Sequence, residues 1–173
     1  MRSSYSDIAN NTYKRREKMR KIMRTAVITV MVFAVALLAA CGGKSADFDV
    51  DTLGNDLATN ITYEDSLAKM DLDMAGMIMN LSDVNITKAA IYEGSGGTAE
   101  EIIVFECASD DDAKKAEEVL KTRVAEQIES FTDYVPAELT KLNAAVIKVN
   151  GRYAVLSVSD TPDEARKIID RYM

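Results

Sequence analysis

Residues 145–158, AVIKVNGRYAVLSV, decide the fold of this chain. Both halves of the stretch are rich in β-branched and aromatic residues, which favour strands, and Asn150-Gly151 lies between them. Asparagine and glycine tolerate the left-handed backbone angles that a type I′ turn requires at its two central positions. The stretch therefore predicts a tight antiparallel hairpin with a type I′ turn at Asn150-Gly151.

A helix is predicted directly after this hairpin. Thr161 and Glu164 have the spacing of a capping box, and Pro162 suits the first turn of a helix. The residues expected on the buried face of this helix are Ala165, Ile168, Ile169 and Tyr172. The last third of the chain thus has the order strand, strand, helix.

The preceding part of the chain repeats that order. Residues 86–92 and 101–108 are predicted strands, joined by the glycine-rich residues 93–98, and residues 110–112 are three aspartates that open a helix. The apolar stripe of this helix is Ala113, Ala116, Leu120, Val124, Ile128 and Phe131. We therefore expect an α+β fold in which two ββα units form a four-stranded, mainly antiparallel sheet with both helices on one face.

Two further helices are predicted before the first ββα unit. Apolar residues recur at helical spacing over residues 50–61, and Asp49 or Asp51 can cap that helix. A second pattern runs over residues 67–81 and is weakened by Gly76, so this helix is expected to be short. Residues 49–173 are accordingly interpreted as one α+β domain.

Residues 1–40 predict a bacterial lipoprotein signal peptide, and residues 41–48 predict a short tether. Basic side chains precede an apolar run at 26–40, which as a helix would be about 22 Å long, less than the ~30 Å hydrocarbon core of a bilayer. The run ends in Leu-Ala-Ala-Cys, so Cys41 is expected to carry lipid and become the mature N-terminus. Translation is expected to start at Met19, which already opens a compact basic segment.

Removing the signal peptide changes the net charge of the part of the chain that meets partners. The chain has 21 basic and 28 acidic residues, of which 8 basic and 2 acidic ones precede Cys41, leaving 13 basic and 26 acidic residues and a formal charge of −13. This acidity argues against a nucleic-acid partner, because nucleic-acid binding relies on basic surfaces. The expected contact with the membrane is the lipid on Cys41 alone.

Cysteine and histidine usage excludes several chemistries. With Cys41 lipidated, Cys107 is the other cysteine of the chain, so no intrachain disulfide can form. Cys107 lies in an apolar run and is expected to be a small buried hydrophobe. The chain has no histidine, which excludes Ser-His and Cys-His pairs. Enzyme chemistry based on carboxylates or lysine stays open, but the sequence favours a non-catalytic protein and indicates no catalytic residue and no cofactor.

Two groups of residues resemble metal ligands. Met70, Met74 and Met77 have the spacing of one helical face, which could hold Cu(I), although an adaptable core is the favoured interpretation. The aspartates at 110–112 could offer carboxylates to Ca²⁺, but they lack the alternating ligands and the glycine of a calcium loop. We therefore assign no metal site.

Glu100-Glu101 stands beside the glycine-rich loop and could be a catalytic carboxylate pair or part of an anion cradle. Adjacent residues of a strand point to opposite faces, however, and Gly94-Ser95-Gly96-Gly97 matches no phosphate-loop pattern. Cys41, as the point of lipid attachment, is the one site residue that the sequence indicates.

Several segments of the chain stand in a recognisable order: the lipobox at Cys41, residues 67–73, residues 94–101 before an Ile-Val-Phe strand, residues 131–134 and the hairpin at 150–156. In this order they resemble a family of uncharacterised lipoproteins from Firmicutes, domain of unknown function 4358. The resemblance covers nearly all of residues 47–173 and implies the membrane location and the fold, with no activity, cofactor or catalytic residue.

Two function classes remain. The favoured one is a non-catalytic, lipid-anchored binding or assembly protein on the outer face of the cytoplasmic membrane, which contacts a protein, a peptide or an envelope polymer through a sheet face or the loop at 94–98. The alternative is an envelope hydrolase, or an accessory subunit of one, that uses carboxylates. A concave pocket with two carboxylates of raised pKa would favour the hydrolase, and a flat or apolar patch would favour the binding protein.

Overall fold

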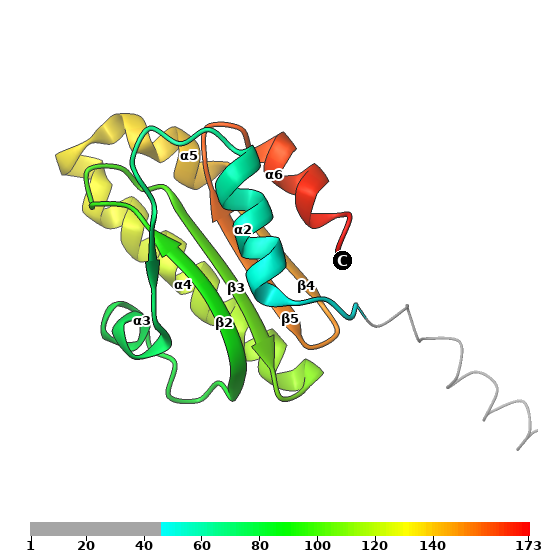
Figure 1. Cartoon of the computed structure of the whole chain (residues 1–173). Helices are drawn as coiled ribbons and strands as arrows, with labels where there is room; N and C mark the ends of the chain where they lie inside the picture. The colour runs from blue at the N-terminus through cyan, green and yellow to red at the C-terminus, as the bar shows by residue number, and fades with distance from the viewer. Residues whose placement is uncertain (1–45) are drawn as a thin grey trace, which may run out of the picture. The chain divides into compact units, whose positions relative to one another are not determined.

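The computed structural model describes residues 46–173, in which helices pack on a five-stranded sheet (Figure 1). The strands stand in the order β1-β2-β3-β5-β4, and every neighbouring pair is antiparallel. Their bounds are Ala68–Met70 for β1, Ile86–Glu93 for β2, Glu101–Cys107 for β3, Val146–Asn150 for β4 and Tyr153–Val158 for β5. The expected fold class and antiparallel pairing are confirmed.

The expectation of four strands is wrong, because β1 adds a fifth at the edge of the sheet. The sequence pattern placed residues 67–81 in one helix, but Ala68–Met70 instead pairs with residues 91–93 of β2. The side chain of Asp71 accepts a hydrogen bond from the backbone N–H of Met74 and caps helix α3, Leu72–Ile78. A local cap thus ends the strand and starts the helix within a single apolar pattern.

Helices cover both faces of the sheet, which corrects the expectation that they share one face. Helices α2 (Val50–Asn60) and α6 (Pro162–Ile169) pack on one side, while α3, α4 (Asp110–Tyr134) and α5 (Leu139–Asn143) pack on the other (Figure 1). The short 3-10 helix η2, Pro136–Glu138, joins α4 to α5. The two helices that follow the hairpins, α4 and α6, therefore lie on opposite faces.

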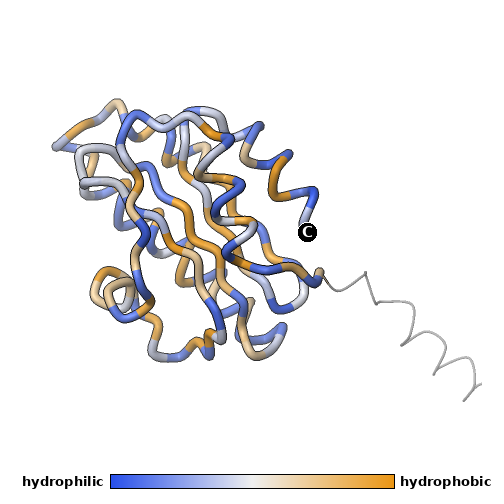
Figure 2. Tube along the Cα trace, in the orientation of Figure 1, coloured by the Kyte–Doolittle hydropathy of each residue, from blue (hydrophilic) through white to orange (hydrophobic). Residues whose placement is uncertain are grey.

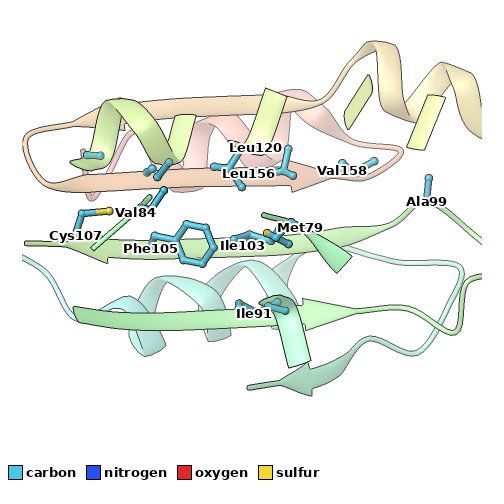
Figure 3. Packing of buried hydrophobic residues seen from close by; sticks show 14 of the residues in the cluster. Met79, Val84, Ile91, Ala99, Ile103, Phe105, Cys107, Leu120, Leu156 and Val158 are labelled. Carbon is cyan, nitrogen blue, oxygen red and sulfur yellow. The ribbon is translucent and has the colours of Figure 1, made fainter. Parts of the chain in front are cut away.

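The central strand β3 shows why both faces must be covered. Ile102 and Val104 pack into the α2–α6 cluster, whereas Ile103 and Phe105 pack into the α4 cluster, beside Leu120 (Figure 3). A continuous apolar run, unlike an alternating one, is the pattern of a strand that is buried on both sides. The hydropathy colouring agrees, with mostly hydrophobic residues along the central strands and alternating hydrophobic and hydrophilic residues along the helices (Figure 2). Both faces of β3 are therefore covered.

The hairpin β4–β5 is confirmed, but its turn is not of type I′. The last pair of the ladder is Asn150 with Tyr153, so Gly151 and Arg152 are the two central residues. Gly151 has a φ of 55°, while no residue other than glycine has a positive φ in the part of the chain that the structure describes. Positive φ at the first central position alone is the pattern of a type II′ turn.

Both ends of the described chain pack against the hairpin. The ring of Phe48 stacks on Tyr153 with a centroid distance of 4.2 Å, and it meets Tyr172 edge-on at 5.6 Å. Residues 46–48, which the sequence assigned to the tether, are thus in contact with the domain. Helix α2 also approaches β2 closely at Gly54, where a Cβ atom would lie 2.8 Å from Cβ of Ala90, so glycine is required there.

The two helices after the hairpins begin differently. Ser109 caps α4, because its hydroxyl accepts from the backbone N–H of Asp112 at 3.1 Å and donates to the carboxylate of the same residue at 2.7 Å. The capping box predicted at Thr161 is wrong, since its side chain makes no capping hydrogen bond and its hydroxyl oxygen is buried without a partner. Pro162 occupies the first turn of α6 as expected.

Candidate functional site: a groove along α4

A groove runs along one side of helix α4 and consists of two adjoining basins. The larger basin has a volume of about 650 Å³ and the smaller about 290 Å³, and Arg123 lines both. The larger basin lies between α4 and the segment that links α3 to β2, which contributes Met79, Asn80, Asp83 and Val84. The α4 residues of the larger basin are Lys115, Glu118, Val119, Thr122, Arg123 and Glu126.

The smaller basin continues toward the C-terminal end of α4. It is lined by α4 residues from Arg123 to Tyr134, by Ile78 of α3, and by Gly96 and Thr98 of the loop between β2 and β3. From Lys115 to Tyr134 the groove therefore follows α4 for about 28 Å, at a rise of 1.5 Å per residue. The volume of the larger basin lies in the range of small-molecule pockets, which is about 300–1,000 Å³.

Beneath the point where the basins meet, Arg123 holds two glutamates of the sheet. Its guanidinium donates to Glu93 at 2.6 Å from Nη2 and to Glu101 at 3.1 Å from Nε. Glu93 and Glu101 are a directly opposed pair on the antiparallel strands β2 and β3, so their side chains share the α4 face. Two like charges in this position are unfavourable unless a cation or a proton compensates them.

The Glu101 carboxyl group is fully buried, and burial raises its pKa to about 8 against the opposing effect of Arg123; Glu93 adds to the rise. One oxygen of each glutamate, Oε2 of Glu93 and Oε1 of Glu101, is buried without a hydrogen-bond partner. A proton on Glu101 removes the repulsion between the two carboxylates and supplies a donor where two acceptors lack one. At neutral pH this raised pKa favours the protonated form of Glu101.

Glu100 directly precedes β3, has partners other than those of Glu101, and belongs to a second cluster. Its Oε1 accepts from Nζ of Lys141 at 3.2 Å, and Lys141 also contacts Glu138 at 3.2 Å and Glu64 at 3.1 Å. Although burial lowers the pKa of Lys141, hydrogen bonds to these three carboxylates raise it overall. The cluster fixes structure, because its members bond to one another and to the backbone.

Glu100 also orders the segment after α2, since its Oε2 accepts from the backbone N–H groups of Glu64 and Asp65 at 2.9 and 3.0 Å. Asp65 in turn accepts from the backbone N–H and the hydroxyl of Ser95 at 2.5 and 2.6 Å. The glycine-rich loop is thus held at Ser95, and Gly96, with a φ of 86°, lines the smaller basin. Glu100 and Glu101 therefore have separate structural partners.

The methionine triple does not form a site. Met70 lies in β1, whereas Met74 and Met77 lie on α3, so the three side chains do not share a helical face. The favoured interpretation as core is also wrong for two of them, because Met74 is 52% and Met77 84% exposed. With Tyr134 at 68%, they are the large hydrophobic side chains that stand exposed in the described part of the chain.

The aspartates at 110–112 are explained by the start of α4. Asp111 pairs with Lys114 at 2.9 Å and Asp112 with Lys115 at 3.0 Å, each one turn along the helix. Within residues 46–173 no group of cysteine and carboxylate side chains is arranged to hold a metal ion. Cys107 is buried, as the sequence predicted, and burial raises the pKa of its thiol to about 11.

Cys41 and the predicted signal peptide lie outside the described residues, so their assignment stays a prediction. Among the helices of residues 46–173, none combines the length and apolar character that crossing a bilayer requires.

Sequence reasoning missed the residues that build the groove. Thr122, Arg123 and Glu126 lie outside the apolar stripe predicted for this helix and were given no role, and Glu93 was placed at the start of a loop. The sequence did contain a clue to this site. Glu93 ends β2 and Glu101 begins β3, and two strands joined by a short loop are expected to pair. Acidic side chains at that position required a cation from the helix above.

Comparisons with known proteins show which family the chain belongs to. Over residues 63–159 the chain matches the sequence profile described as Domain of unknown function (DUF4358). This range contains β1 to β5, α3 and α4, and hence every residue that lines the two basins. Neither the curated proteins nor the solved structures gave a significant match. Because the profile spans more than half of the sequence, the chain belongs to the family of Domain of unknown function (DUF4358).

Proposed function

We propose that this chain is a lipid-anchored binding protein on the outer face of the cytoplasmic membrane, and that its binding site is the groove along α4. The anchor rests on the sequence: a basic segment, a short apolar run and the Leu-Ala-Ala-Cys motif that ends at Cys41. Two or three acyl chains on one cysteine would hold the protein stably, because each buried methylene contributes about 0.8 kcal/mol.

The groove is the observation that carries the binding role. Helices pack on both faces of the sheet, so the surface available for a partner lies on helices, loops and the edges of the sheet. Of these surfaces, the α4 side combines two hollows with the exposed Met77 and Tyr134. Exposed apolar side chains beside a concave surface are typical of interaction sites, and methionine adapts to partners of varied shape. The loop at 94–98, which the sequence singled out for contact, borders this groove.

An envelope hydrolase, or an accessory subunit of one, is the second candidate, and the pair Glu93 and Glu101 is the observation in its favour. The raised pKa of Glu101 beside a second glutamate resembles an acid and base pair. The side chain of Glu101 is inaccessible, however, so Glu93 alone could reach a substrate in the smaller basin. A binding protein accounts for this arrangement better, because a glycosidase places two carboxylates against the scissile bond.

In-cell photocrosslinking tests the binding site. A photoreactive phenylalanine analogue at Thr122, an exposed residue of the larger basin, should give a discrete crosslinked product in living cells. The matched control is the same analogue at Lys167, an exposed residue of α6 on the opposite side of the sheet. Equal products at both positions, or none at Thr122, would contradict a binding site in the groove.

Acyl labelling tests the anchor. The Cys41→Ser variant should lose incorporation of labelled palmitate and accumulate as the unprocessed precursor, whereas Cys107→Ser, which changes a buried thiol, should keep the label. Palmitate that persists on Cys41→Ser would show that the lipoprotein assignment is wrong.

A further inference from the structure

The charges of the larger basin are unevenly paired. Its two basic residues already have acidic partners, since Lys115 contacts Asp112 at 3.0 Å and Arg123 is held by Glu93 and Glu101. Its acidic residues have fewer basic partners. Glu118 shares Lys121 with Glu117, while Asp83 and Glu126 form no ion pair with any residue in the part of the chain that the structure describes.

The two unmatched carboxylates belong to different walls of the basin. Asp83 is on the segment that links α3 to β2, and Glu126 is on α4. Between these walls, the buried Met79 and Val84 and the half-buried Val119 supply an apolar lining. A ligand that fits this basin therefore combines an apolar part with positive charge, because a neutral ligand would leave the rim uncompensated.

The smaller basin adds apolar surface but no net charge. Glu93 and Arg123, its charged residues, neutralise each other at 2.6 Å. Tyr134 and the partly exposed Ile78 contribute the apolar part. An occupant that spans both basins would thus place positive charges toward Asp83 and Glu126 and apolar groups along the remaining length.

We propose that the groove binds a cationic amphipathic segment of a partner protein, with lysine or arginine at the rim carboxylates Asp83 and Glu126 and apolar side chains over the two basins. This proposal rests on the proposed binding function and names the class of partner. The length of about 28 Å along α4 corresponds to roughly 18 residues of a helix, so a segment of that size can occupy both basins. Helix-in-groove binding of this kind uses apolar anchors at one helical face.

Fluorescence anisotropy with a labelled 18-residue peptide tests the proposal. The probe consists of leucine and lysine, with leucine at helical spacing, and is titrated with the full chain in non-ionic detergent. A second peptide has glutamate in place of every lysine, and a neutral oligomer of N-acetylglucosamine serves as an uncharged probe. The expected result is that the leucine–lysine peptide binds, that its binding weakens with salt, and that the other two probes do not bind.

Charge reversal locates the binding. Asp83→Lys combined with Glu126→Lys should weaken the leucine–lysine peptide at least about tenfold, because like charges then face each other across the contact. The matched control Glu164→Lys, combined with Asp133→Lys, changes the net charge equally at exposed positions that line neither basin. All four positions are exposed, so these changes should alter stability by about 0.5 kcal/mol or less each.

Equal weakening in both double variants would overturn the proposal, since the peptide would then respond to overall acidity alone. Absence of binding would overturn it too, as would binding of the neutral oligomer that charge reversal leaves unchanged. Failure of the proposed function is a separate outcome. If Thr122 still yields a specific crosslink in cells while the cationic peptide does not bind, the groove is a binding site and the class of partner is wrong.

Discussion

Replacing Glu101 by glutamine should stabilise the protein at neutral pH. In the unfolded chain this glutamate releases its proton near its ordinary pKa of 4.5, whereas the folded protein retains the proton up to a pKa of about 8. Between these values the unfolded state binds fewer protons than the folded state, so stability falls as pH rises. The contribution of protonated Glu101 is complete below pH 4.5 and is lost as pH rises through about 8.

The size of the effect follows from the pKa difference. Each pH unit in this window costs about 1.4 kcal/mol, so the buried acid lowers the free energy of unfolding by up to about 3 kcal/mol at pH 7 relative to pH 4.5. Glutamine has the same shape and no charge to lose. Its carbonyl oxygen can accept from Arg123, and its amide can donate to the buried Glu93 oxygen that lacks a donor.

Urea denaturation of wild type and Glu101→Gln at several values between pH 4.5 and 9 measures the difference. The variant should match the wild type at the acidic end and exceed it increasingly toward pH 8. Glu118→Gln, an exposed change on α4, should show no such trend. A stability difference that is independent of pH, or that falls with rising pH, would show that Glu101 is ionised in the folded protein and would refute the reasoning.

Three further predictions concern packing and burial. Lys141→Met should lower the free energy of unfolding by about 3–5 kcal/mol in urea denaturation, because the buried carboxylates of Glu100 and Glu138 then lose the positive charge that neutralises them. Unchanged stability would contradict that role. Gly54→Val should cost about 1–3 kcal/mol, because its Cβ would lie 2.8 Å from that of Ala90, whereas Gly76→Ala, with open space around it, should not destabilise; calorimetry distinguishes them. Phe48→Ala should lower stability by about 2 kcal/mol through loss of its aromatic stacking, and an unshifted melting temperature would place residues 46–48 in the tether after all.

The parts of the fold that local sequence determines could be predicted. The hairpin at 145–158 and the long helix that follows β3 depend on strand propensity, turn residues and helical periodicity within one segment. The stripe from Ala113 to Phe131 indeed packs into the core. Even there the turn type was wrong, because the pairing register of Asn150 with Tyr153 moved the glycine to the first central position.

The arrangement of those parts could not be predicted from the similarity between the two halves. Whether α4 and α6 share a face depends on what else covers the sheet, and α2 occupies the α6 side. The continuous apolar run of β3 contained the evidence, since it requires burial on both faces. Pattern similarity alone gave no information about the side on which each helix crosses.

The groove was missed because its chemistry is non-local. Arg123 reaches Glu93 and Glu101 across 30 and 22 residues of sequence, and Lys141 reaches Glu100 across 41. No spacing rule within one element links such residues. Only the pairing of β2 with β3 brings the two glutamates under α4.

Methionine methyl NMR tests most directly whether the groove on α4 is the binding site. Met79 lines the larger basin and Met77 stands exposed on α3 next to Ile78 of the smaller one, whereas Met173 packs with the α2–α6 cluster on the opposite side of the sheet. In the full chain with ¹³C-methyl methionine, titrated with the leucine–lysine peptide, the signals of Met79 and Met77 should shift in proportion to occupancy while Met173 stays in place. A shift of Met173 with no change at Met79 would contradict the account and place the binding site elsewhere.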